Sequence, residues 1–296
     1  MKEELAKIKD FRFDGDGEFD LSACPTSLEV PDEQLEFYEA ALEKNAKKIA
    51  KLQEKLFAAG EEGVVFLIQA MDAAGKDSTA KHVLAKCNPV GIFDYSFRTP
   101  TKEELAHDYL WRGHCHMPVR GEIGFFNRSY YEDVLVVRVN GLWKGYKWPK
   151  RCFDMDEQDF FDKRFRQIRD YERYLYENGY RLVKIFLNVS LDEQANRFIR
   201  RIDKPDKNYK FSAGDLGNRA QWEQYMAAFQ DSIAKTSTKK NPWFVIPADQ
   251  KPVARYLASE ALLKALKDID PEFPEPGESA KQEMAELRAK LVAGEI

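Results

Sequence analysis

The chain has 296 residues, enough for one large α/β domain with additional segments or for two small domains. Hydrophobic residues make up 44% of it and charged residues 32%, a composition that fits a soluble protein with a sizeable core. Its formal net charge of −4 argues against general affinity for nucleic acid, so any cationic site must be a local concentration of Lys and Arg. Because the apolar runs are strand-sized and residues 1–7 do not resemble a signal peptide, we expect a cytoplasmic protein without a membrane segment.

Residues 1–30 are mixed in composition, and we expect an irregular N-terminal segment there. A long helix is predicted over residues 32–57, ended by Gly60. Apolar residues recur along it every seven positions, and such a seam fits packing along its own domain and self-association about equally. We take forward self-association into a homo-oligomer, a dimer or tetramer, as the prediction to test. The seam consists of Leu35, Leu42, Ile49 and Leu56, with Tyr38, Asn45 and Leu52 on the interleaved positions.

The segment at residues 63–79 has the pattern of a phosphate-binding loop. Residues 64–68 predict a strand buried on both faces, and a helix is predicted over residues 79–85. The small-residue loop between them would direct backbone N–H groups and the helix N-terminus at an anion. We expect Lys76 to lie in a solvent-facing loop, with its ammonium reaching the phosphate oxygens. The candidate phosphate-binding residues are Ala73, Ala74, Gly75, Lys76, Asp77 and Ser78.

This loop departs from the usual Walker A pattern, G-x-x-x-x-G-K-[ST], at two positions. Ala70 stands where the first glycine is expected, and Asp77 stands where a hydroxyl would bind Mg²⁺. Asp72, inside the loop, is the candidate replacement for that missing metal ligand. The strand–loop–helix context therefore supports phosphate binding despite the imperfect match.

Strands and helices alternate through the rest of the chain, which predicts a doubly wound parallel sheet with helices on both faces and ligands at the carboxyl ends of the strands. Residues 31–268 would form one P-loop kinase-like catalytic domain, and residues 269–296 a proline-containing linker and a short C-terminal helix bearing Met284, Leu287 and Leu291. The further predicted strands are 91–97, 122–127, 181–189 and 243–246, and the further helices are 101–111, 155–176, 191–202, 221–235 and 252–267.

Polar side chains follow the strand predicted at residues 122–127, whose Phe125 and Phe126 we assign to the core. The strand ends directly in Asn127, Arg128 and Ser129, which should emerge at the carboxyl edge of the sheet. A second phosphate or metal contact belongs there in a phosphate-loop fold. The alternative is that Arg128 merely pairs with a surface acid.

A cationic segment follows the helix predicted at residues 191–202. Such segments are usually solvated surface, but this one follows a strand–helix unit and runs into an irregular stretch, as lids over phosphate sites do. Six cations within fourteen residues would hold a polyanion longer than one nucleoside triphosphate. We therefore predict a basic lid at about residues 200–217. Arg197, Arg200 and Arg201 lie on one side of the predicted helix. The six cations are Arg197, Arg200, Arg201, Lys204, Lys207 and Lys210.

Soft metal ligands are scarce in the sequence. The run His114-Cys115-His116 has no partner pair elsewhere, so we do not assign a zinc site to it. The four cysteines lack zinc or disulfide spacing, and we expect reduced, structural thiols. They are Cys24, Cys87, Cys115 and Cys152.

Four segments in the right order resemble the polyphosphate kinase 2 family over about residues 30–268. They are M-D-A-A-G-K-D at 71–77, F-N-R-S-Y-Y-E-D-V at 126–134, R-R-I-D-K-P-D-K-N-Y-K-F-S at 200–212 and P-W-F-V-I-P-A-D-Q-K at 242–251. The resemblance implies a thymidylate-kinase-like core that transfers phosphate between inorganic polyphosphate and adenine, or also guanine, nucleotides, with Mg²⁺ or Mn²⁺ as the metal. Asn127 departs from the Asp of many members, and this form resembles the class acting on both nucleoside mono- and diphosphates.

The resemblance also implies roles for individual residues. Lys76 and Arg128 would hold the transferring phosphoryl group, while Asp72 would hold Mg²⁺ and orient the attacking phosphate. The lid cations Arg200, Arg201, Lys204, Lys207 and Lys210 would clamp the polyphosphate. Asp215 and Arg219 match a lid motif without an assigned role.

Two other functions compete with this interpretation. An ATP-dependent nucleoside monophosphate kinase would carry Gly at position 70 and Ser or Thr at position 77, and this chain has neither. A non-catalytic nucleotide-binding module that assembles through the helix at residues 32–57 would not need both Arg128 and a six-cation lid.

Overall fold

The structure, a computed structural model, describes residues 5–210 and 213–296. Within these residues six strands form one sheet, in the order β1-β6-β5-β2-β4-β3. Four neighbouring pairs run parallel and β1 pairs antiparallel with β6, so the predicted doubly wound parallel sheet is confirmed. From one edge to the other the strands are β1 (Arg12–Phe13), β6 (Trp243–Pro247), β5 (Tyr180–Asn188), β2 (Gly63–Gln69), β4 (Ile123–Asn127) and β3 (Ile92–Ser96).

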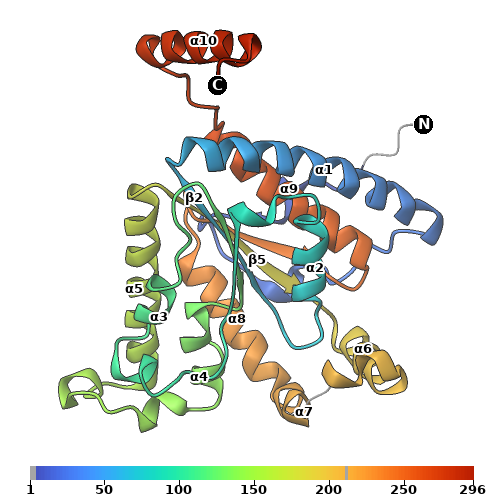
Figure 1. The fold of residues 1–296 in the computed structure, drawn as a ribbon. Helices are drawn as coiled ribbons and strands as arrows, with labels where there is room; N and C mark the ends of the chain where they lie inside the picture. Colours follow the sequence, from blue (N-terminus) through green and yellow to red (C-terminus); the bar gives the residue numbers. More distant parts are fainter. Residues whose placement is uncertain (1–4, 211–212) are drawn as a thin grey trace.

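Helices cover both faces of the sheet, which explains why β2 is buried along its whole length and apolar from Val64 to Ile68 (Figure 1). One face carries α1 (Asp32–Ala59), α2 (Lys76–Val83) and α9 (Lys251–Ile269), and the other carries α5 (Glu157–Glu177) and α8 (Trp222–Thr236). The remaining helices are α3 (Trp111–His114), α4 (Val136–Val139), α6 (Leu191–Asp203), α7 (Ala213–Ala220) and α10 (Glu278–Ala293).

The heptad seam of α1 packs against its own domain. Leu42, Ile49 and Leu56 are buried, and α1 lies along α9. The Asn45 amide donates to Ser259 Oγ of α9 at 3.0 Å, so the polar position of the seam also has its partner within the chain. The prediction that this seam self-associates is therefore wrong, and the intramolecular alternative holds. A seven-residue repeat indicates that a helix packs along a long apolar surface, but it does not indicate whether that surface belongs to the same chain or to another one.

Three element predictions need correction. The helix expected over residues 101–111 is only a turn at Glu104–Ala106, because the Asp108 carboxylate accepts the Leu110 N–H at 3.0 Å and so ends the first turn and starts another. The N-terminal segment is not wholly irregular, since it supplies β1, an edge strand too short for an alternating pattern. The helix of the phosphate loop begins at Lys76 rather than Thr79.

The basic segment that we predicted to be an irregular lid contains regular helical structure. Pro205 follows the end of α6, and the Asn208 amide donates to the last carbonyls of that helix, Arg201 O at 2.9 Å and Ile202 O at 2.7 Å. A 3₁₀ helix spans Pro205–Lys210, and α7 starts at Ala213. The lid of the following sections is the segment from α6 through α7.

The described helices include none with the length and apolar composition needed to cross a bilayer. All four cysteines are free thiols, as predicted; Cys115 is exposed and the other three are half-buried.

Candidate active site

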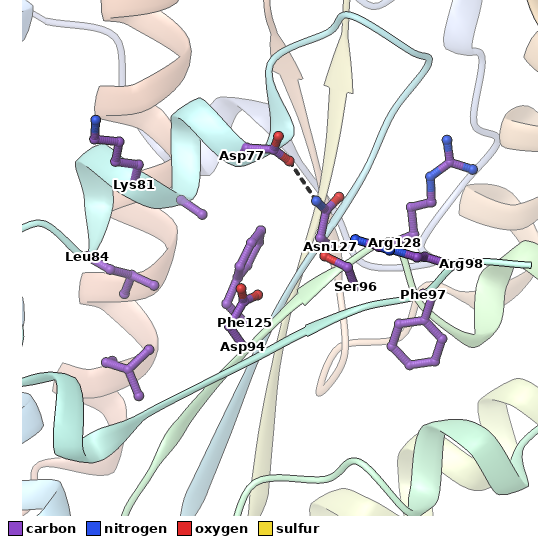
Figure 2. Close-up of a pocket in the computed structure, with 12 residues that line it drawn as sticks. Asp77, Lys81, Leu84, Asp94, Ser96, Phe97, Arg98, Phe125, Asn127 and Arg128 are labelled. Atoms are coloured by element: carbon purple, nitrogen blue, oxygen red, sulfur yellow. Dashed lines mark hydrogen bonds between the residues drawn. The ribbon is translucent and has the colours of Figure 1, made fainter. Parts of the chain in front are cut away.

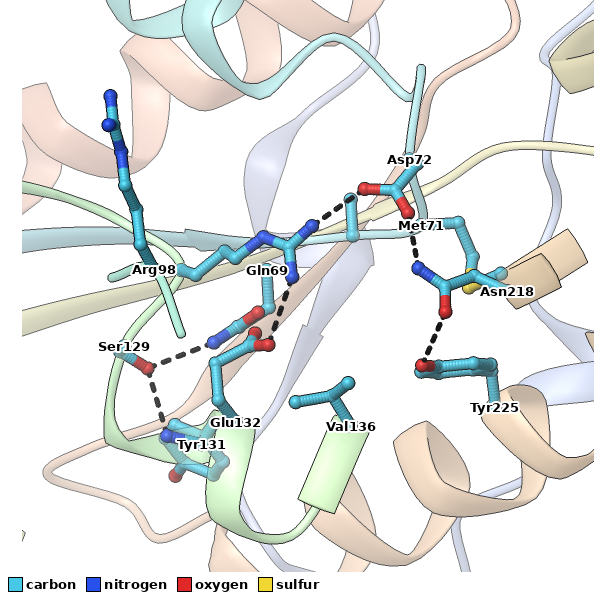
Figure 3. Close-up of polar contacts among 12 residues, drawn as sticks. Gln69, Met71, Asp72, Arg98, Ser129, Tyr131, Glu132, Val136, Asn218 and Tyr225 are labelled. Atoms are coloured by element: carbon cyan, nitrogen blue, oxygen red, sulfur yellow. Dashed lines mark hydrogen bonds and ion pairs between the residues drawn. The ribbon is translucent and has the colours of Figure 1, made fainter. Parts of the chain in front are cut away.

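The site forms where β2 and β4 end side by side, so that the loops after these two parallel strands meet at one edge of the sheet. Across this edge the Arg128 guanidinium donates to Asp72 Oδ1 at 2.7 Å and to Glu132 Oε2 at 3.1 Å. Asn218 of the lid donates to Asp72 Oδ2 at 2.8 Å, and its own oxygen accepts from Tyr225 at 3.1 Å (Figure 3). Two residues predicted from separate segments, Asp72 and Arg128, are thus in direct contact.

A turn of unusual backbone geometry sets the direction of Arg128. Its φ is 67°, in the left-handed region that non-glycine residues rarely adopt, and its N–H donates to Ile68 O at 3.1 Å. The Ser129 hydroxyl then accepts the Tyr131 N–H at 3.2 Å and caps the turn at Tyr130–Asp133. Backbone strain of this kind concentrates at functional sites, where the surrounding structure maintains it.

Lys76 lies beneath the phosphate loop instead of facing solvent, and only 9% of the residue is exposed. Its ammonium donates to Ala70 O at 2.9 Å and Met71 O at 3.1 Å, so the lysine fixes the loop that surrounds it. Burial, and then the charge of Arg128, lower the pKa of Lys76 to about 8. The expectation of a solvent-facing lysine was wrong, because six loop residues can close over a side chain of this length.

The phosphate loop is held from behind by Arg197. The loop needs left-handed geometry at Ala73 (φ 63°) and at Gly75 (φ 109°). The Arg197 guanidinium, from α6, donates to Ala73 O at 3.3 Å and to Ala248 O at 2.6 Å, and the residue is 5% exposed. Arg197 therefore joins α6 to the loop. Its two terminal NH2 groups donate to backbone carbonyls and its Nε donates to Glu193 Oε1 at 2.8 Å, and the residue also borders the groove of the lid cations. Its place in a cation-rich run concealed this role, which only the long-range contact reveals.

Asp72 is poised to be ionised. Burial alone would raise the pKa of its carboxyl, but the charges of Lys76 and Arg128 outweigh that effect and lower the pKa below its ordinary value. The Asn218 hydrogen bond acts in the same direction. Sequence reasoning missed Asn218, which lies in the lid segment between the predicted residues Asp215 and Arg219.

Asp77 and Asn127 face each other at the mouth of a second recess (Figure 2). The Asn127 amide donates to Asp77 Oδ1 at 2.6 Å, so the two departures from the usual motifs are partners in space. The recess has a volume of about 610 Å³ and also contains Lys81, Asp94 and Ser96.

A cationic groove of about 650 Å³ runs from the phosphate loop to the lid. Arg200 and the exposed Lys204 and Lys207 line it, as predicted, together with Ser78 and Arg201. Lys251, at the start of α9, was not predicted; burial and the charges of Arg197 and Arg200 lower its pKa to about 8. The side chains of Lys210 and Asp215 lie outside the described part of the lid.

Arg219 lies away from the groove, in contact with α6. Its guanidinium donates to Leu191 O at 2.6 Å and to Gln194 Oε1 at 3.0 Å. The Gln194 amide in turn donates to Asp72 O at 2.9 Å. Arg219 therefore braces α7 against α6, one residue from the Asn218 that contacts Asp72.

On the opposite side of Arg128 lies a larger cavity of about 1000 Å³. Aromatic side chains line its walls, including Tyr109, Tyr146 and Trp148, and Arg98 reaches it from the end of β3. Arg128 borders both this cavity and the cationic groove. The site thus consists of a cationic groove and an aromatic cavity, with one arginine bordering both.

Comparison with known proteins identifies the family that shares this arrangement. The sequence model of the family described as polyphosphate kinase 2 matches residues 33–274. The chain belongs to the polyphosphate kinase 2 family. The matched range contains the phosphate loop, the Arg128 turn and the whole lid, so the resemblance inferred from four short segments is confirmed.

Individual members of the family are similar over nearly the whole chain. An ADP-polyphosphate phosphotransferase of Rhodopseudomonas palustris is 41% identical over 288 residues, which are 97% of this chain and 99% of that protein. An AMP/ADP-polyphosphate phosphotransferase of Meiothermus ruber is 41% identical over 275 residues, covering 91% of this chain and 96% of the other. The crystal structure of polyphosphate kinase 2 from Arthrobacter aurescens TC1 superposes with a TM-score of 0.83 at 36% identity, covering 95% and 98% of the two chains.

Proposed function

We propose that this chain is a polyphosphate:nucleotide phosphotransferase that moves phosphate between inorganic polyphosphate and nucleoside mono- or diphosphates. The single observation that carries the proposal is the position of Arg128, between the cationic groove and the aromatic cavity. The names of the two similar proteins, which act on ADP or on AMP and ADP with polyphosphate, support it.

The cationic groove fits a phosphate chain better than a nucleotide. Its lining combines five cations of the lid with Lys76, Arg128 and Lys251. Among the described lining residues, Tyr209 is the one aromatic side chain on which a base could stack. Each phosphate of a polyphosphate carries about one charge, so a row of cations can neutralise several phosphates in succession. We therefore assign the groove to polyphosphate.

The aromatic cavity fits the nucleoside part of the second substrate. Tyr109, Tyr146 and Trp148 offer ring surfaces for a base, and Arg98 and Arg128 lie on the side of the groove, where the phosphates of the nucleotide would be. Asn127 leaves Asp77 with an amide partner in place of a second carboxylate, which reduces negative charge near the acceptor phosphates. Lower repulsion fits acceptance of both mono- and diphosphates.

The residues present fit Mg²⁺. Mg²⁺ is usually held by one or two carboxylates, substrate phosphates and water, so it does not require a closed cage of protein ligands. Asp72 would hold it, since the carboxyl is ionised and each oxygen retains a lone pair beyond its contact with Arg128 or Asn218. The chemistry supplied by Mg²⁺, with Mn²⁺ as an alternative, is neutralisation of charge on the phosphate oxygens.

Lys76 and Arg128 would perform most of the remaining work. Phosphoryl transfer depends on positioning and charge neutralisation, and both cations are already fixed by protein contacts before substrate enters. Arg128 would exchange its contacts with Asp72 and Glu132 for contacts with the transferring group. The acceptor phosphate is ionised near neutral pH, so no strong general base is needed.

One assay separates this proposal from its competitors. The protein is mixed with Mg²⁺ and AMP, ADP, GMP or GDP, with either long-chain polyphosphate or ATP as donor, and the nucleotides are separated by chromatography. With polyphosphate as donor we expect phosphorylated nucleotide. With ATP as donor and a monophosphate as acceptor, we expect no more product than the Arg128→Ala variant forms as background. Product with ATP but not with polyphosphate would indicate an ordinary monophosphate kinase. Nucleotide binding without product would indicate a non-catalytic module.

The nucleotide acceptors fit the cytoplasmic location that we expect.

A further inference from the structure

Within residues 5–210 and 213–296, the C-terminal helix α10 is buried against no other element of its own chain. It stands apart from the body of the molecule beyond the linker that follows α9 (Figure 1). Every residue of α10 is exposed, and so are residues 272–277 of the linker. The match to the family model ends at residue 274, so the helix lies outside the matched residues.

A narrow apolar seam runs along α10. Ala280, Met284, Leu287 and Leu291 alternate at spacings of four and three residues, the a and d positions of a coiled coil. Met284 is 49% exposed, Leu287 43% and Leu291 61%. A helix of 16 residues gains little stability in water by itself, so such a seam is useful only when it is covered.

The charges beside the seam specify what covers it. With Met284 at an a position, Glu283 occupies a g position and Arg288 the following e position. In two parallel copies of the helix, each g residue meets the e residue five positions later in the other copy, so Glu283 of each copy meets Arg288 of the second. An antiparallel pairing in the register that matches Met284 with Leu287 would bring Lys281 against Arg288, both positive, and Glu283 against Lys290, so its repulsive and attractive contacts offset each other. The parallel pairing has the attractive contact without the repulsive one.

We propose that α10 pairs in parallel with α10 of a second copy of this chain, forming a short two-stranded coiled coil. The seam of α1 is not available for this role because α9 of the same chain fills it. The linker contains Pro271, Pro274 and Pro276, whose restricted backbone holds the helix away from the domain. The pairing therefore links two catalytic domains without covering either groove.

Cysteine cross-linking of the full chain tests the orientation. In a parallel pair, residue 280 of one helix lies against residue 280 of the other, so Ala280→Cys should form a disulfide-linked dimer under mild oxidation. Gln282→Cys, on the outer side of the same helix turn, should link far more slowly, and the unaltered chain measures the background of its own four thiols. Equal rates of disulfide formation at positions 280 and 282 would overturn the proposal. It would also be overturned if Ala280→Cys formed no dimer by itself but formed a disulfide with Leu291→Cys when the two variants were mixed, because that result indicates an antiparallel pair.

Light scattering tests the seam and its charges. Leu287→Glu should halve the mass of the assembly at micromolar concentration, whereas Ala289→Glu, on the outer face, should not. Glu283→Arg and Arg288→Glu should each weaken the assembly about tenfold or more, and the double reversal should restore it because the opposite charges meet again. An unchanged mass for Leu287→Glu, or a double reversal no better than the single ones, contradicts a parallel pair.

Discussion

Asp72 Oδ1 and the guanidinium of Arg128, 56 positions apart in the sequence, lie 2.7 Å apart across the ends of two neighbouring strands. This pair keeps the carboxyl ionised and the arginine in place before any substrate is present. A polyanion that enters the groove must compete for Arg128 with Asp72 and Glu132. The ion pair thus holds together two groups to which the proposed reaction assigns separate roles.

Asp72→Asn is expected to reduce turnover by a factor of about 100 or more while the fold stays intact, because the charge that would hold Mg²⁺ is lost. Initial rates over a Mg²⁺ titration measure this effect, and the half-saturating Mg²⁺ concentration should rise.

A matched control is Asn218→Ala, which removes the 2.8 Å hydrogen bond to Asp72 but leaves its charge. We expect a loss of less than about tenfold and an unchanged Mg²⁺ dependence, since a typical hydrogen bond contributes roughly 1 kcal/mol. If Asp72→Asn retained the wild-type Mg²⁺ dependence, the metal role would have to be assigned elsewhere.

The pKa of Lys76, about 8, predicts a pH dependence. The ammonium is charged below this pH and neutral above it, so kcat/KM for polyphosphate should fall as the pH rises through about 8. Lys76→Arg keeps a charge throughout this range and should lack this limb, although its maximal rate will be lower because the guanidinium fits the loop poorly.

Lys251 has a similar pKa and is the competing source of such a limb. Lys251→Arg should therefore be measured in parallel and should retain the fall near pH 8. Loss of the limb in Lys251→Arg but not in Lys76→Arg would assign the titration to the groove and not to the phosphate loop.

A buried ion pair supports the Arg128 turn from below. Lys184 of β5 donates to Glu172 of α5 at 2.6 Å, and Glu172 accepts the hydroxyls of Tyr130 and Tyr131 at 2.9 and 2.8 Å. Lys184→Met would leave the Glu172 carboxyl buried without its cation. We expect a loss of about 3–5 kcal/mol in the free energy of unfolding, measured by urea denaturation.

The double variant Lys184→Met with Glu172→Gln checks the cause. The introduced amide is neutral but still offers an oxygen to both tyrosines, so at least half of the lost stability should return. A double variant as unstable as Lys184→Met alone would show that the lysine acts through packing and not through charge.

The sequence predicted the residues that are local to one motif. Lys76 follows a small-residue loop after an apolar strand, and Arg128 follows another such strand, so the parallel sheet brings both to one edge. The lid was predicted because its cations are concentrated in one segment. In each case the chemistry and the element that positions it are adjacent in the chain.

The sequence could not predict contacts that depend on packing. Arg197 belongs to a cationic run, yet it is buried against loop carbonyls 123 and 124 positions earlier. Asn218 reaches Asp72 over 146 positions, and a lone Asn carries no signal for such a contact. The seam of α1 showed that a partner exists, but only the packing against α9 showed which one.

The lid gives the prediction that best separates a polyphosphate enzyme from one using ATP. Changing Arg200, Lys204 and Lys207 together to Ala should raise the KM for long polyphosphate at least tenfold more than the KM for ADP. It should also flatten the salt dependence of polyphosphate KM, because a flexible polyanion is held by several cations at once. Arg201 stays in place so that a candidate catalytic arginine is not removed together with the other three cations. The control removes three exposed lysines of α1, Lys44, Lys48 and Lys51, and should change neither KM. Equal shifts for both substrates, or the same result in the control, would mean that net charge and not the groove determines polyphosphate binding.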